Sequence, residues 1–152
     1  AIARAFPNAQ VGAGTVVHAS QLRQAASAGA KFAVSPGWSA ELCTAARDIH
    51  LPYMPAVMTP GEAMQASQHG HQLLKLFPAE AAGGVDWLRA IAGPMPQLRF
   101  CPTGGIRESQ VAEYLAEPNV LCVGGSWVAP PSLVEKADWE AISRLASLIK
   151  SS

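Results

Sequence analysis

The sequence predicts an α/β fold in which parallel strands alternate with helices, and it favours a (β/α)8 barrel within that class. Short apolar runs begin every 20 to 25 residues along the 152-residue chain, and a period of this size is typical of one repeated strand–helix unit. Segments with recognisable helix ends separate the runs. A glycine pair closes each of the last two runs, and barrels commonly bind phosphate at the loops after their last two strands.

Six apolar runs are the expected strands. They are Gln10–Val16, Phe32–Pro36, Tyr53–Met58, Leu73–Phe77, Leu98–Pro102 and Val120–Trp127. Strands that alternate with helices pair in parallel through right-handed crossovers, and near-continuous apolar runs indicate strands that are covered on both faces. A doubly wound open sheet fits the same alternation, so the barrel prediction depends on where the glycine pairs lie.

Helices are expected in the intervals. The expected segments run from Ser20 to before Gly29, from Ser39 to about Asp48, from Thr59 to near Gly70, from Gly84 to Ala92, from Glu108 to Ala116 and from Asp138 to Lys150. Thr59 opens a capping box and is followed by Pro60 at the first helical position. In the last segment, Ile142, Leu145 and Ile149 share one face.

Composition indicates a folded domain with no affinity for nucleic acid or membrane. Hydrophobic residues make up 49% of the chain, charged residues make up 14%, and the formal net charge is zero. These values favour a compact protein and give no electrostatic footprint for nucleic-acid binding, and no apolar stretch approaches the ~20 residues of a membrane span. Cys43, Cys101 and Cys122 match no metal-site spacing, and we expect them to be buried thiols in a reducing compartment.

The six strands are two fewer than a (β/α)8 barrel requires. The first residues, AIARAFPNA, are typical of the end of a helix that precedes a strand. We therefore expect residues 1–152 to form one N-terminally incomplete barrel domain with about six of its eight strand–helix units. Such a barrel would expose the edge of its first strand, and exposed edges promote association.

Lys75 is the residue that points most directly to chemistry. It lies in an apolar strand between Leu74 and Leu76, followed by Phe77. Burial disfavours the ammonium form and lowers the pKa of a lysine, and a neutral amine can form a Schiff base with a carbonyl substrate. A lysine at a strand end that simply reaches water is the structural alternative.

The glycine pairs predict a phosphate site. One pair lies in the stretch Thr103-Gly104-Gly105 and the other in Gly124-Gly125-Ser126, at the ends of consecutive strands. Glycine lets the backbone turn sharply and brings amide N–H groups close to a ligand. Ordinary tight turns are the alternative for either pair alone. We expect the small residues at positions 12–15 to leave room for a substrate, with Thr15 offering a hydroxyl.

Together, these motifs resemble the 2-keto-3-deoxy-6-phosphogluconate (KDPG) aldolase family. The segments VGAGTV, AVSPG, LLKLFPAE, IAGP, RFCPTGGI and VLCVGGSW follow the order and spacing of that family from about Ala9 to Pro130. The resemblance implies a class I aldolase with a (β/α)8 barrel, which cleaves KDPG reversibly to pyruvate and glyceraldehyde 3-phosphate without a metal or other cofactor. It also implies the Entner–Doudoroff pathway, a cytoplasmic location and a homotrimer when the full barrel is present.

The resemblance also assigns roles to residues. It makes Lys75 the Schiff-base lysine. Substrate contacts fall on Thr15, Phe77, Pro78 and Thr103, and phosphate contacts fall on Gly104, Gly105, Gly124, Gly125 and Ser126. The glutamate that serves the family as acid and base, and the arginine that holds the substrate carboxylate, belong to a strand that we expect to precede this chain. Glu80 is therefore not assigned that role, and we expect it to be structural.

Two positions depart from the family pattern, and three other functions stay open. Ala56 stands where the family often has glycine, and Arg107 stands where relatives often have a small helix-capping residue. Cleavage of 4-hydroxy-2-oxoglutarate (KHG) uses the same imine chemistry on a substrate without phosphate. A phosphate-binding barrel isomerase of the tryptophan-pathway type would not need Lys75. The non-enzymatic alternative is an inactive barrel fragment.

Overall fold

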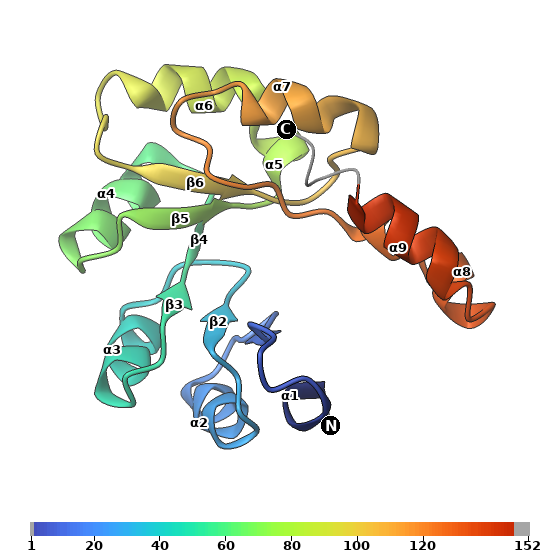
Figure 1. Cartoon of the computed structure of the whole chain (residues 1–152). Helices are drawn as coiled ribbons and strands as arrows, with labels where there is room; N and C mark the ends of the chain where they lie inside the picture. The colour runs from blue at the N-terminus through green and yellow to red at the C-terminus, as the bar shows by residue number, and fades with distance from the viewer. Residues whose placement is uncertain (1, 148–152) are drawn as a thin grey trace.

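Strands and helices alternate along the chain, and every strand pair is parallel (Figure 1). The structure is a computed structural model that describes residues 2–147. Its strands are β1 (Gly12–Ala13), β2 (Phe32–Val34), β3 (Tyr53–Met54), β4 (Ala56–Val57), β5 (Leu73–Leu76) and β6 (Arg99–Pro102). They form two three-stranded sheets, in the orders β1-β2-β3 and β4-β5-β6. The parallel α/β class predicted from the sequence is confirmed.

The helices fill the intervals between the strands. They are α1 (Ile2–Ala5), α2 (Ala19–Ser27), α3 (Ala40–Asp48), α4 (Pro60–Gln68), α5 (Ala79–Ala82), α6 (Gly84–Ala92), η1 (Glu108–Gln110), α7 (Val111–Leu115), η2 (Ser126–Val128), α8 (Pro131–Glu135) and α9 (Trp139–Ser147). Figure 1 shows α6 and α7 side by side over one face of the second sheet, while α8 and α9 extend away from it. Among residues 2–147, no helix is both long and apolar enough to cross a membrane.

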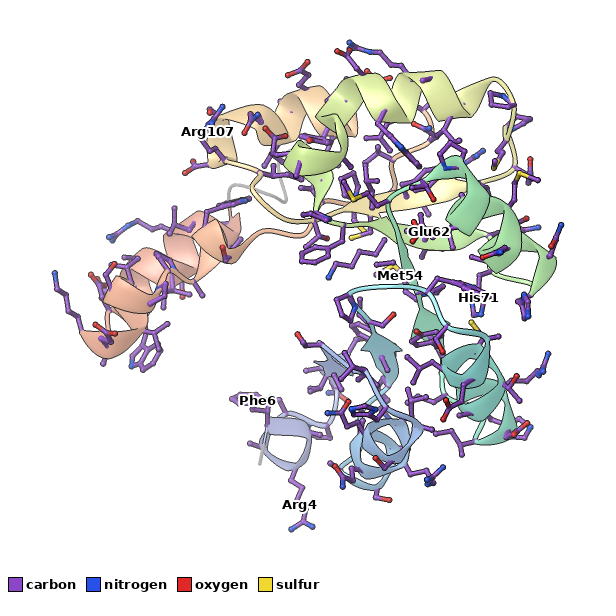
Figure 2. All side chains as sticks on the ribbon, turned by 180° about the vertical axis from the view of Figure 1, so that it is seen from behind. Arg4, Phe6, Met54, Glu62, His71 and Arg107 are labelled. Carbon is purple, nitrogen blue, oxygen red and sulfur yellow. The ribbon has the colours of Figure 1, made fainter. Side chains whose placement is uncertain are left out.

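The strands of residues 2–147 lie in two separate parallel sheets and form no closed barrel. The third expected strand, Tyr53–Met58, divides at Pro55 into β3 and β4. Proline has no amide hydrogen and cannot donate to a neighbouring strand, although its carbonyl still accepts from the Lys75 N–H at 2.9 Å. Figure 2 shows Met54 at this passage between the sheets.

The sixth expected strand, Val120–Trp127, forms only two isolated bridges to the β6 region. Phe100 pairs with Val120, and Thr103 pairs with Gly124. The sequence offset between partners grows by one residue from the first bridge to the second, as in a β-bulge that accommodates an extra residue. Cys122 lies in this irregular stretch and is exposed, which corrects the expectation of a buried thiol, whereas Cys43 and Cys101 are buried.

The helix-end signals are largely confirmed. Thr59 and Glu62 form the predicted capping box of α4, and Ser39 accepts from the Leu42 N–H at the start of α3. The N-cap of α2 is His18 and not the expected Ser20. At this helix start the His18 N–H donates a hydrogen bond to the Gln21 side chain at 3.0 Å. The segment predicted over 108–116 begins as the 3₁₀ turn η1 before α7. Residues 148–150 of the last predicted helix lie outside the described residues.

Each sheet packs its own apolar cluster. Leu22, Ala33 and Leu42 belong to the cluster between the first sheet and helices α2 and α3. The larger cluster joins the second sheet to α4, α6 and α7. In β5, Leu74 and Leu76 are fully buried in that larger cluster. Because successive side chains of a strand point to opposite faces, Lys75 points away from this cluster.

Candidate active site

Lys75 occupies the middle strand of the second sheet. Its strand, β5, pairs with β4 on one side and with β6 on the other. In register, Lys75 lies between Ala56 and Cys101, so these three side chains share one face of the sheet. Ala56 is fully buried and Cys101 is 8% exposed. Strand pairing on both sides therefore fixes the backbone that presents the lysine amine.

The surroundings of the Lys75 amine favour its neutral form. The Nζ atom lies 4.2 Å from the centre of the Phe77 ring. Burial lowers the pKa of the Lys75 amine, and the negative charge that the Cys101 thiol can carry opposes this effect more weakly. The hydrogen bond with the Cys122 thiol is the largest cause that lowers the pKa of Cys101. A half-buried amine with a lowered pKa is the arrangement that imine chemistry needs.

The loop that carries Gly104 and Gly105 is bonded to the chain segment directly after Lys75. The Ala79 N–H donates to the Thr103 carbonyl at 2.9 Å, and the Glu80 N–H donates to the Gly104 carbonyl at 3.2 Å. The Thr103 N–H donates in turn to the Leu76 carbonyl at 2.9 Å. The first glycine pair therefore lies at the same end of the second sheet as the end of the lysine strand.

The second glycine pair is held beside the first. The Thr103–Gly124 bridge joins the two segments, and the Gly124 N–H donates to the Pro102 carbonyl at 2.8 Å. The backbone amides of Gly104, Gly105, Gly125 and Ser126 donate to no acceptor within residues 2–147. The structure therefore brings together both predicted glycine pairs, with four amide donors available for an anion.

Close packing excludes larger side chains from these glycines. A Cβ at Gly104 would lie 3.0 Å from the Phe77 ring and 3.2 Å from the Pro78 Cα, and the φ angle of +101° disfavours any other residue. A Cβ at Gly124 would collide with the Thr103 Oγ1. A Cβ at Gly125 would collide with the indole nitrogen of Trp127. Contact with neighbouring side chains, as well as turn geometry, thus explains the glycines.

Thr15 belongs to the region of the first sheet, whereas Lys75 lies in the second. Thr15 follows β1 in the first sheet, is exposed, and has a positive φ of 57°. Within residues 2–147 no hydrogen bond joins its hydroxyl to the Lys75 region. The space expected at positions 12–15 is present only in part. The Phe32 ring occupies the place that a Cβ at Gly12 would take, whereas no atom lies within 4 Å of a Cβ built at Gly14.

Comparisons with known proteins give this geometry a family. Residues 1–145 match the family described as KDPG and KHG aldolase. The KHG/KDPG aldolase of Escherichia coli K12 is 48% identical over 146 residues, which cover 96% of this chain and 68% of that protein. The 2-dehydro-3-deoxy-phosphogluconate aldolase of Pseudomonas aeruginosa is 46% identical over 140 residues, which cover 92% of this chain and 64% of that protein.

A solved structure agrees with the sequence comparisons. It is the KDPG aldolase of Legionella pneumophila with pyruvate captured at low pH as a covalent carbinolamine intermediate. This chain matches it with a TM-score of 0.95 and 42% identity, over 97% of this chain and 72% of that one. This chain belongs to the KDPG and KHG aldolase family. It spans about two thirds of the length of the curated relatives it matches.

In this aldolase family member, the carboxylate of Glu80 is engaged away from the lysine strand. It accepts hydrogen bonds from the Tyr114 hydroxyl and from the Gln110 side-chain amide, the latter at 2.8 Å. This agrees with the expectation of a structural role for Glu80. The sequence did not indicate Tyr114 or Gln110 as partners of Glu80. They follow Glu80 by 34 and 30 positions, and no local pattern predicts contacts over such separations.

Two further features concern charged and metal-ligating side chains near the candidate site. Arg107 is exposed and directly precedes η1, where Figure 2 shows it at the edge of the molecule. Its backbone N–H donates to the Gln110 side chain at 3.0 Å. In the part of the chain that the structure describes, no three His, Cys, Asp or Glu side chains converge as a metal-ligand group.

Proposed function

We propose that this protein is a class I aldolase that cleaves KDPG to pyruvate and glyceraldehyde 3-phosphate through a Schiff base on Lys75. The observation that carries the proposal is the half-buried Lys75 amine on the central strand β5, whose end adjoins two neighbouring glycine pairs with available amides. The carbinolamine trapped in the Legionella relative supports the same covalent chemistry.

The chemistry follows from the amine. Neutral Lys75 attacks the C2 ketone, and loss of water leaves a protonated imine that acts as an electron sink. The C3–C4 bond then breaks as the C4 hydroxyl loses its proton to a base, which gives an enamine and the aldehyde product. Protonation of the enamine at C3 and addition of water release pyruvate and restore the amine. Each assisted proton transfer typically contributes about 10²–10⁴-fold to such a rate.

The remaining site roles are part of the proposal. Phe77 and Pro78 lie next to the lysine, Thr15 contributes its hydroxyl to the pyruvyl part of the substrate, and Thr103 contributes to the phosphate end. The amides of Gly104, Gly105, Gly125 and Ser126 bind the phosphate, while Gly124 lets the two loops approach. The unpaired donors next to one another are a suitable cradle for an oxyanion.

We extend the proposal to the fold and its setting. The strand–helix units belong to a single (β/α)8 barrel domain, of which this chain contributes six, and the full barrel assembles as a homotrimer in the cytoplasm. The ligands are a phosphorylated keto acid and pyruvate, and the reaction needs no cofactor. Light scattering on the purified protein measures the assembly directly.

A coupled assay tests the activity. Pyruvate release from KDPG is followed with lactate dehydrogenase for the unaltered protein and for Lys75→Arg, which keeps a long cation but cannot form the imine. We expect the variant to lose more than about 10³-fold in kcat, because the covalent route is removed. The same assay with 4-hydroxy-2-oxoglutarate measures how much the phosphate contributes. Equal rates for Lys75→Arg and the unaltered protein would contradict the proposal.

A further inference from the structure

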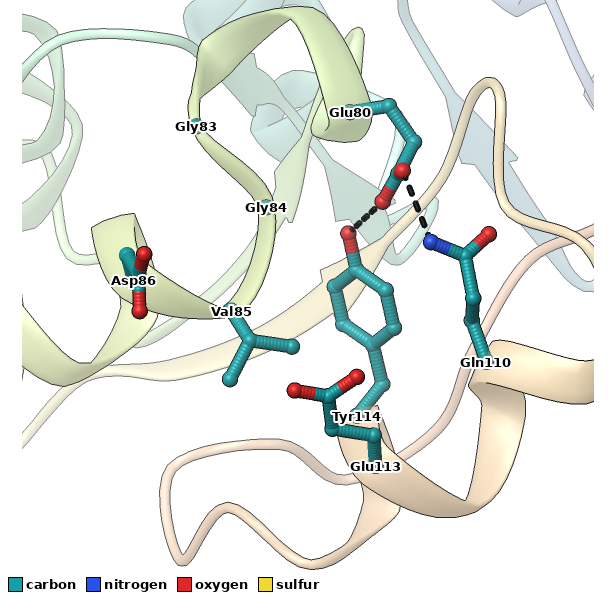
Figure 3. Close-up of a pocket in the computed structure, with 8 residues that line it drawn as sticks. All are labelled: Glu80, Gly83, Gly84, Val85, Asp86, Gln110, Glu113 and Tyr114. Carbon is teal, nitrogen blue, oxygen red and sulfur yellow. Dashed lines mark hydrogen bonds between the residues drawn. The ribbon is translucent and has the colours of Figure 1, made fainter.

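Glu80 lies at the centre of a hydrogen-bonded group on the helical side of the second sheet. Figure 3 shows its carboxylate directed toward Tyr114 and Gln110 in a pocket between α5–α6 and η1–α7. Tyr114 is 1% exposed, so its hydroxyl has been withdrawn from water and needs an acceptor. The hydrogen bond from Tyr114, followed by that from Gln110, holds the pKa of Glu80 below its usual value. The carboxylate is therefore charged at neutral pH, and each of its oxygens accepts one of these hydrogen bonds.

The same residue is bonded to the loop that carries the first glycine pair. The Glu80 N–H donates to the Gly104 carbonyl at 3.2 Å. A Cβ at Gly105 would lie 3.0 Å from both the Cβ and the Cγ of Glu80, so the glycine packs directly on the side-chain stem. Further along the loop, Gln110 accepts from the Arg107 N–H and donates to the Glu80 carboxylate. Glu80 thus holds the start and the end of the loop over residues 104–110.

Glu80 also has a short connection to the lysine amine. It follows Lys75 by five positions, across the turn at Phe77 and Pro78. The centre of the Phe77 ring lies 4.2 Å from the Lys75 Nζ. The same ring also packs against Gly104. The loop is therefore located relative to the amine by one packing contact through Phe77 and by the hydrogen bonds through Glu80.

We propose that Glu80, together with Tyr114 and Gln110, is a positioning residue that sets the separation between the Gly104–Gly105 amides and the Lys75 amine. This inference rests on the proposed function and deepens it. The group supports binding of the phosphate end of the substrate. It takes no part in imine formation or proton transfer, because the two oxygens of the Glu80 carboxylate accept hydrogen bonds from Tyr114 and Gln110. Small displacements of positioned groups weaken binding or reaction strongly, since productive geometry is narrow.

Variants of the hydrogen-bonded group test this role by comparing two substrates. Tyr114→Phe removes one hydroxyl and keeps the packed ring, and Glu80→Gln removes the charge. Glu113→Gln is the matched control, because Glu113 lines the same pocket and is exposed, and no hydrogen bond from its side chain is formed within residues 2–147. For each protein, kcat and KM are measured with KDPG and with 4-hydroxy-2-oxoglutarate. Urea unfolding and the rate of pyruvate–borohydride labelling of Lys75 are measured alongside.

The expected result is a selective loss on the phosphorylated substrate. We expect KM for KDPG to rise about 10-fold in Tyr114→Phe and Glu80→Gln, in line with the loss of a hydrogen bond to a charged group. Inhibition by inorganic phosphate should weaken by a similar factor. The kcat for KDPG, both parameters for 4-hydroxy-2-oxoglutarate and the labelling rate should stay within about twofold of the unaltered protein, because the imine site is unchanged.

Three results would overturn the inference. Equal losses on both substrates, together with slower labelling, would show that Glu80 serves the stability of the whole site. Unchanged KM for KDPG in folded Tyr114→Phe would show that the hydrogen bonds do not locate the phosphate loop. If the unaltered protein itself were not labelled by pyruvate, the proposed function would fail, and the positioning role toward Lys75 would fail with it.

Discussion

The Nζ of Lys75 lies 4.2 Å from the centre of the Phe77 ring, two residues further along the same strand segment. Two effects on the amine oppose each other here. An aromatic face stabilises a cation by about 0.5–1 kcal/mol at accessible sites, whereas burial disfavours the cation. Burial is the largest cause of the lowered pKa of Lys75. The ring contact favours the ammonium form, whereas burial favours the neutral amine that can attack a carbonyl.

The first prediction concerns the pH dependence of this amine. As pH rises through a lowered pKa, the neutral fraction of Lys75 grows earlier than it would for an ordinary lysine with a pKa of 10.5. Reductive labelling of Lys75, followed by peptide mass spectrometry across pH, should therefore have its midpoint below that ordinary value. In Phe77→Leu the midpoint should fall by about a further half unit, since the cation loses the ring. A midpoint that rises in this variant would contradict the explanation.

The second prediction is that Lys75 reduces the stability of the protein. Lys75→Met keeps the length of the side chain and removes a half-buried amine, so the free energy of unfolding at neutral pH should stay the same or rise by up to about 1 kcal/mol, as is common where a functional residue is replaced. Urea unfolding at pH 7 measures this difference. A loss of more than about 2 kcal/mol would mean that the amine contributes to the fold.

The third prediction concerns the loop glycines. Gly104→Ala should lower the free energy of unfolding by about 1–3 kcal/mol, because the new methyl meets the Phe77 ring and the Pro78 backbone at a strained φ of +101°. Gly61→Ala is the matched control, since Gly61 lies in the first turn of α4 and the nearest atom to a Cβ there is the Thr59 Oγ1 at 4.0 Å. The control should be neutral or stabilising, and equal losses in both variants would count against the packing argument.

The fourth prediction follows from the lowered pKa of Glu80. A carboxyl with a lower pKa in the folded state stabilises the fold fully above its unfolded pKa, near 4.5, and this contribution is lost as pH falls through the folded value. The stability gap between the unaltered protein and Tyr114→Phe should therefore be larger at pH 7 than at pH 3. Urea unfolding at the two pH values measures it, and a gap that does not change with pH would show that the charge of Glu80 is not involved.

The sequence predicted the fold where local signals are strong. The capping box at Thr59 and the apolar strand around Lys75 depend on neighbours within a few positions, and both are present in the structure. The division of a strand at Pro55 was missed, because apolar periodicity does not register a lost amide hydrogen. The exposure of Cys122 was missed because its segment pairs with the β6 region only through isolated bridges.

The candidate site was predictable to a similar degree. The lysine and the two glycine pairs could be found as motifs, and the structure shows why they adjoin: the Thr103–Gly124 bridge joins segments 21 residues apart. The contacts of Glu80 with Gln110 and Tyr114 join positions 30 and 34 residues apart through side chains. Such contacts depend on how α5 packs against α7, which no local pattern specifies.

The most direct test of the central claim is covalent trapping at Lys75. The protein is incubated with pyruvate and borohydride, digested, and mapped by mass spectrometry, with Lys75→Met treated in parallel. An imine lysine predicts a reduced pyruvyl adduct on the peptide that contains Lys75, and no adduct in the variant. No adduct on Lys75, or the same labelling in Lys75→Met, would contradict the assignment of this residue as the Schiff-base lysine.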